Sequence, residues 1–83
     1  MQQNARTAQQ IGAIVRRERR KRRLTQADLG GKVGLRQATI SKLEKGEPAT
    51  QLRTLLDVIA ALGLQIVITE RVRSSKEDIE DLF

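Results

Sequence analysis

The residues best suited to recognition chemistry lie close together, between positions 36 and 45. The spacing predicts a helix over 37–45. At 100° per residue, Leu43 and Glu44 fall on the same side of this helix as Ile40. The opposite side carries Ala38, Ser41, Lys42 and Lys45. A small, polar and basic face of this kind fits the major groove of DNA, where phosphates flank the base edges.

Individual side chains in this stretch have different expected partners. Gln37 can form a bidentate hydrogen bond to adenine, Ala38 can contact a thymine methyl group, and Arg36 can reach a guanine or a phosphate. The expected base contacts are Arg36, Gln37, Ala38 and Ser41. The expected backbone contacts are Gln26, Thr39, Lys42 and Lys45. The alternative is a solvated face on an ordinary helical bundle, which would suffice to explain Ser41 or Lys45 alone.

Composition excludes several other kinds of chemistry. The 83 residues include no Cys and no His, which excludes a disulfide framework, a structural zinc site and a Ser–His or Cys–His catalytic pair. Phe83 is the one aromatic residue, so aromatic platforms that stack on single-stranded nucleic acid are missing. The net charge of +6 favours anionic partners. We therefore expect no metal, no cofactor and no enzymatic activity.

The sequence also predicts where the protein works. No apolar run approaches the ~20 residues of a membrane span. The polar N-terminus has no apolar signal segment. These features predict a cytoplasmic, nucleoid-associated protein without a membrane partner.

Further helical patterns precede and follow residues 36–45. The first is expected to start at Thr7, and the second at Thr25, where Asp28 completes a capping box. The second ends at Gly34 and the third at Gly46. A fourth pattern runs from near Thr50 to Gly63. Its apolar positions at helical spacing are Leu52, Leu55, Leu56, Ile59 and Leu62.

A basic run, RRERRKRR, spans residues 16–23. It is either an electrostatic patch or a solvated helix face. Arg19 differs from its neighbours because it falls four residues after Val15, on the stripe that should face the core. A buried charge needs a partner, and Glu44 on the inward face of the third helix is the best candidate. We expect a structural ion pair here rather than a DNA contact.

The pattern changes after Gly63. Residues 64–69 are rich in β-branched side chains and predict one strand, with no second strand in the chain to pair with it. Pairing with the same strand of a second subunit about a two-fold axis would satisfy its backbone. The residues expected in this dimer strand are Leu64, Ile66, Val67 and Ile68. The alternative is an extended arm packed on the chain's own helices.

The C-terminal residues form an acidic tail. Positions 73–83 carry two basic and four acidic side chains. Such a tail is disordered by default, yet Ile79, Leu82 and Phe83 would share one face of a short helix and could dock on a partner. The expected organisation is a flexible N-terminus (1–6), a helical DNA-binding domain (7–63), a dimerisation strand (64–72) and this tail (73–83).

The whole string TQADLGGKVGLRQATISKLEKG resembles the helix-turn-helix of the Cro/Xre repressor family. The resemblance covers roughly residues 10–63 and implies a mainly α, lambda-repressor-like bundle of four or five helices whose third helix is the recognition helix. It also implies the Arg19–Glu44 pair. One departure is Gly30-Gly31, which stands where the family usually has an alanine and a polar residue. Each mid-helix glycine costs about 1 kcal/mol relative to alanine. Gly30 could permit close packing of the recognition helix, whereas Gly31 has no explanation.

The strings LRQATISKLE and LDVIAALGLQIVI further resemble HipB-type antitoxins. This resemblance implies a homodimer that binds double-stranded operator DNA, represses its own operon and neutralises a HipA-like serine/threonine kinase toxin. One alternative is a free-standing Xre-type regulator without a toxin, for which the tail is dispensable. Another is a protein-interaction module whose affinity for DNA is non-specific. Its salt slope, which is the slope of log affinity against log salt concentration, would then be the same for every DNA sequence.

Overall fold

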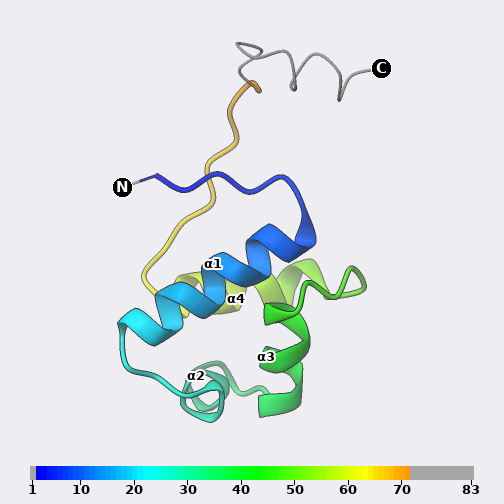
Figure 1. Cartoon of the computed structure of the whole chain (residues 1–83). Helices are drawn as coiled ribbons and strands as arrows, with labels where there is room; N and C mark the ends of the chain where they lie inside the picture. The colour runs from blue at the N-terminus through cyan, green and yellow to red at the C-terminus, as the bar shows by residue number, and fades with distance from the viewer. Residues whose placement is uncertain (1, 72–83) are drawn as a thin grey trace.

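Figure 1 shows how the helices of this computed structural model are arranged. The structure describes residues 2–71, and four α-helices lie in that part of the chain. They are α1 (Ala8–Lys21), α2 (Gln26–Val33), α3 (Gln37–Glu44) and α4 (Leu52–Ala61). Helix α3 packs against both α1 and α2, and α2 also packs against α4. The mainly α bundle predicted from the sequence is confirmed.

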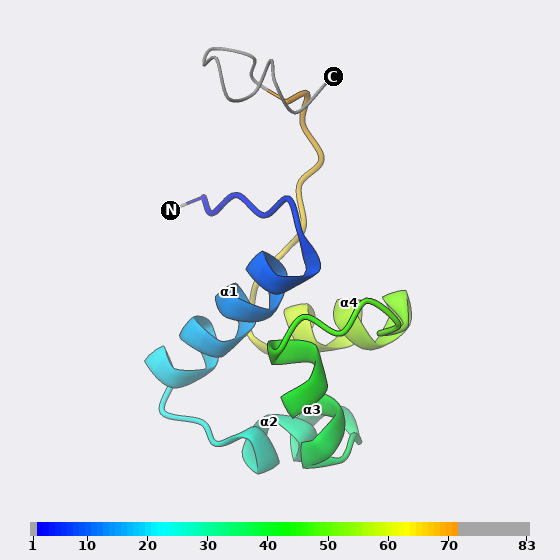
Figure 2. The same ribbon diagram turned by 45° about the vertical axis from the view of Figure 1, so that its right-hand side comes forward.

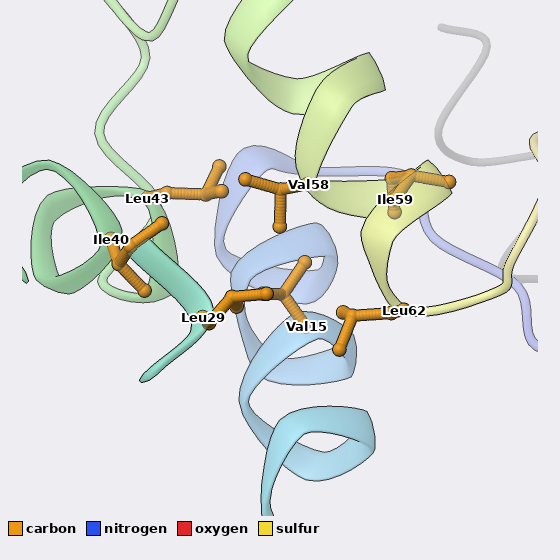
Figure 3. Packing of buried hydrophobic residues seen from close by; sticks show 7 residues of the cluster. All are labelled: Val15, Leu29, Ile40, Leu43, Val58, Ile59 and Leu62. Atoms are coloured by element: carbon orange, nitrogen blue, oxygen red, sulfur yellow. The ribbon is translucent and has the colours of Figure 1, made fainter. Parts of the chain in front are cut away.

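One apolar core joins the four helices. Figure 3 shows its side chains converging from all of them. The core residues are Val15, Leu29, Ile40, Leu43, Val58, Ile59 and Leu62. Because α3 contributes two of these side chains, burial of its inner face fixes the helix on the bundle.

Local capping explains why the first two helices begin where the sequence predicts. The Thr7 hydroxyl accepts a hydrogen bond from the Gln10 N–H at 3.1 Å. Thr25 and Asp28 form a complete capping box, with both hydrogen bonds at 2.9 Å. Two orphan N–H groups are thereby satisfied at the start of α2.

The buried face of α4 agrees only in part with the one that its pattern indicates. The helix begins at Leu52, slightly after the expected start. Leu52 is 67% exposed and Leu56 is 46% exposed, although both share the predicted apolar stripe. The core takes Val58 in their place, whereas Ile59 and Leu62 are buried as the pattern indicates. The apolar band is wider than one contact face, so periodicity alone does not select the side that is buried.

The segment after Gly63 leaves the helical body. Figures 1 and 2 show residues 2–6 and 64–71 running on the side of the body opposite α2. Leu64 packs partly against the core. In the described single chain no backbone ladder pairs with residues 64–71. The expected strand and its pairing are therefore not confirmed.

Two further properties hold for residues 2–71. No helix there is long and apolar enough to cross a membrane. No group of three or more acidic side chains is placed to hold a metal ion. The tail residues Ile79, Leu82 and Phe83 lie outside the described residues.

Candidate nucleic-acid interface

The turn between α2 and α3 sets the direction of the outward-facing helix. Gly34 adopts the left-handed conformation (φ 70°) that glycine tolerates best. The Leu35 N–H donates to the Gly30 carbonyl at 2.8 Å. A Cβ at Gly30 would lie 2.5 Å from the Leu35 carbonyl oxygen, whereas a Cβ at Gly31 would meet nothing within 4 Å. Gly30 therefore permits close approach of α2 to the turn before α3, and not to α3 itself. No packing contact requires a glycine at position 31.

Helix α3 has an apolar inner face and a polar outer face. Ile40, Leu43 and Glu44 are buried. The predicted DNA-contacting residues are distributed as follows: Arg36, Gln37, Ala38, Lys42 and Lys45 are exposed, and Gln26, Thr39 and Ser41 are half-buried. The outer face matches the helical-wheel expectation, with Thr39 and Ser41 at its edges.

A buried ion pair ties α1 to α3. Arg19 Nε donates to Glu44 Oε2 at 2.6 Å, and Arg19 Nη2 donates to Glu44 Oε1 at 3.0 Å. Arg19 Nη1 also donates to the Leu24 carbonyl at 2.8 Å. Hydrogen bonding to Glu44 raises the pKa of Arg19, so the guanidinium stays charged despite its burial. The structure thus brings together the two residues expected to pair.

Gln26 links this ion pair to the exposed start of α3. Its Nε2 donates to Glu44 Oε1 at 3.2 Å. Its Oε1 accepts from Gln37 Nε2 at 3.4 Å. A chain of hydrogen bonds therefore runs from the buried Arg19 to Gln37. The sequence suggested a backbone contact for Gln26 but not these bonds, because they depend on how the two helix starts are brought together.

The sequence also does not predict the close approach of α1 to the end of α3. A Cβ at Gly12 would lie 2.5 Å from the Glu44 carbonyl oxygen and 2.6 Å from that of Leu43. Only glycine leaves room for these two backbones to touch. The available signal was a lone glycine among the apolar residues of the first helical pattern, Ile11, Ile14 and Val15, because an isolated glycine inside a helix can mark a packing contact.

A second ion pair lies within the basic run. Arg22 Nη1 donates to Glu18 Oε1 at 2.9 Å and to the Glu18 carbonyl at 2.8 Å. Gln3 Nε2 donates to the same carboxylate at 3.2 Å. The hydrogen bond from Arg22 lowers the pKa of Glu18 against the opposing effect of burial. Arg22, like Arg19, already has a carboxylate partner within the chain.

The apolar residues expected to mediate dimerisation are largely exposed in the single chain. Ile66 is 48% exposed, Val67 56% and Ile68 94%. Leu64 is half-buried against the helices. The segment is thus not an arm folded fully onto its own body.

Sequence comparisons agree with this geometry. The helix-turn-helix family model matches residues 15–68. The uncharacterized HTH-type transcriptional regulator y4mF of Sinorhizobium fredii is 37% identical over 68 residues, covering 82% of this chain and 90% of that protein. Antitoxin HipB of Escherichia coli K12 is 34% identical over 56 residues, covering 68% of this chain and 64% of the antitoxin. These relatives are named as a regulator and an antitoxin, not as enzymes.

Solved structures of HipB have a similar fold. The HipB-O4 20mer complex matches with a TM-score of 0.77 at 28% identity, covering 83% of this chain and 97% of that chain. The HipA-HipB-O2-O3 complex gives the same TM-score, identity and coverage.

Proposed function

Because the chain belongs to the Cro/Xre-type helix-turn-helix family, we propose that it is a sequence-specific DNA-binding transcriptional repressor. One observation carries this proposal: the outer face of α3 is small, polar and basic, while its inner face is anchored by the core and by the Arg19–Glu44 pair. A rigid helix with such a face can lie in the major groove without burying an unpaired charge. DNA binding would locate the protein at the nucleoid, in the cytoplasm.

In this mechanism two α3 helices, one from each subunit, lie in successive major grooves about 34 Å apart on a palindromic operator. The base-reading residues are Arg36, Gln37, Ala38 and Ser41. The backbone-holding residues are Gln26, Thr39, Lys42 and Lys45. Gln26 also orients Gln37, since the two amides are in contact at 3.4 Å. Gln37 keeps an oxygen and an N–H with which it can pair to an adenine edge.

Dimerisation through residues 64–69 completes the proposal. Ile68 is 94% exposed in the single chain, and exposed large apolar residues in a segment without a ladder partner favour pairing with another chain. A two-fold pairing of identical segments would satisfy both backbones at once. This arrangement would also fix the spacing of the two recognition helices.

The antitoxin role is the second part of the proposal. Its support is the similarity to HipB, including a solved complex that also contains HipA. By this analogy the chain represses its own operon and neutralises a HipA-like serine/threonine kinase, with the tail 73–83 as a candidate docking segment. A free-standing regulator is the competing function, because the relative with the longer match, y4mF, is named as a transcriptional regulator and not as an antitoxin.

Two experiments test the two parts separately. Footprinting on the chain's own promoter should give a protected palindrome, and a featureless pattern would contradict sequence-specific binding. Affinity purification of the tagged chain from its native cells, at salt high enough to strip DNA, should recover a stoichiometric kinase-like protein. Recovery of the chain without such a partner would leave the free-standing regulator as the function.

A further inference from the structure

A basic cleft lies between α1 and α3, beside the proposed base-reading face. Its volume is about 310 Å³. The lining residues are Arg16, Arg19, Arg20, Gln26, Ser41, Glu44 and Lys45. The cleft therefore borders two of the residues proposed to contact DNA from α3, Ser41 and Lys45, and extends their surface onto α1.

The charges in the cleft are unbalanced. Glu44 is the one carboxylate among the lining residues, and its two oxygens accept hydrogen bonds from Arg19 and Gln26. Arg16, Arg20 and Lys45 are exposed and form no ion pair within residues 2–71. Three cationic residues thus line one opening whose single carboxylate is already neutralised.

We propose that this cleft binds a phosphate of the DNA backbone, with Arg16 and Arg20 as phosphate contacts from α1. The inference rests on the proposed function, since a duplex with α3 in its major groove has a sugar–phosphate strand along each edge of that groove. The cleft lies at the α1 edge of α3. Guanidinium groups match the geometry of phosphate oxygens and can bind two of them at once.

The residues of the basic run (16–23) then have different roles. Arg19 and Arg22 are held by Glu44 and Glu18. Arg17 and Lys21 are exposed but do not line the cleft. This division provides a matched control on the same helix with the same change of charge.

The test compares two double variants, Arg16→Gln/Arg20→Gln and Arg17→Gln/Lys21→Gln. Affinity is measured against salt on two duplexes, one selected for tight binding from a random library and one unrelated. Each phosphate contact contributes about 0.9 to the salt slope. Because Arg16 and Arg20 hold one phosphate, the cleft variant should lower the slope by about 0.9 per subunit on the selected duplex. The control variant should leave the slope close to that of the wild type. Phosphate ethylation interference should disappear at particular positions in the cleft variant alone.

Three outcomes would overturn the proposal. The control variant could lower the slope as much as the cleft variant, which would make the effect one of net charge. The cleft variant could bind with an unchanged slope and an unchanged interference pattern. The charge-preserving variant Arg16→Lys/Arg20→Lys could lose as much slope as the glutamine variant, which would point to a disturbed structure.

Failure of the proposed function has a different signature. A wild-type chain that binds both duplexes equally is not sequence-specific, whatever the cleft variants do. In that case the slopes of the two glutamine variants still decide whether the cleft holds phosphate.

Discussion

Arg19 and Glu44 connect the scaffold to the recognition helix through two hydrogen bonds of 2.6 and 3.0 Å. Both residues are buried, at 7% and 8% exposure. Gln26 shares the Glu44 carboxylate and contacts Gln37. The ion pair therefore does two things: it neutralises a charge on the inner stripe of α1, and it supports the side chains that face the DNA.

Removing one member of this pair should be costly. Arg19→Met leaves the Glu44 carboxylate buried without its cation, and the free energy of unfolding should fall by about 3–5 kcal/mol. In the double variant Arg19→Met/Glu44→Leu neither charge of this pair remains, so it should regain much of that loss. Urea denaturation of the three proteins measures this. Equal stability of the Arg19→Met variant and the wild type would refute a structural role for the pair.

The two adjacent glycines of α2 should respond in opposite ways to alanine. Gly31→Ala should raise the free energy of unfolding by about 0.5–1 kcal/mol, because a Cβ there meets nothing within 4 Å and glycine is a poor helix former. Gly30→Ala should lower it by about 1–3 kcal/mol, because its Cβ would lie 2.5 Å from the Leu35 carbonyl oxygen. Thermal melts of both variants provide the comparison. The same direction of shift in both would contradict the packing described.

Acid should weaken the start of α2. The backbone N–H of Thr25, with its hydroxyl, holds the pKa of Asp28 below the ordinary value of 3.8. A carboxylate with a lowered folded-state pKa stabilises the protein above its unfolded-state pKa, and this contribution is lost as the pH falls through the folded-state pKa.

The stability difference between the wild type and Asp28→Asn should therefore be largest near pH 6–7. It should shrink as the pH falls below the ordinary carboxyl range of about 4. Denaturation series at several pH values measure it. A difference that is independent of pH would exclude the carboxylate charge as the stabilising feature.

Lys45 tests the backbone-holding group. Lys45→Ala should weaken binding to every duplex by a similar factor and lower the salt slope by about one per subunit, because each subunit loses one phosphate contact. Affinities on the selected and the unrelated duplex, each at several salt concentrations, measure both effects. An unchanged slope would remove Lys45 from the phosphate contacts.

Local patterns were enough to predict much of this molecule. The Thr25–Asp28 capping box, the turn at Gly34 and the inner face of α3 all follow from residue type and spacing within one element. The partners of buried charges were also predictable where one cation and one anion fell on facing stripes. That rule led from Arg19 to Glu44.

Features that depend on contact between elements were not predictable. The tight approach at Gly12 depends on how α1 crosses the end of α3. The contact between Gln26 and Gln37 depends on how two helix starts meet. The exposure of Leu52 and Leu56 depends on which side of a broad apolar band the neighbouring helices cover. Periodicity within one helix carries none of this information.

The most direct test of the account is the sequence preference of Gln37→Ala. On the selected operator this variant should lose about 1–3 kcal/mol of binding free energy. On a panel of operators changed at each base pair in turn, it should lose discrimination at one position in each half-site and retain it elsewhere. A uniform loss on every operator, with the base preferences of the wild type intact, would contradict base reading by α3.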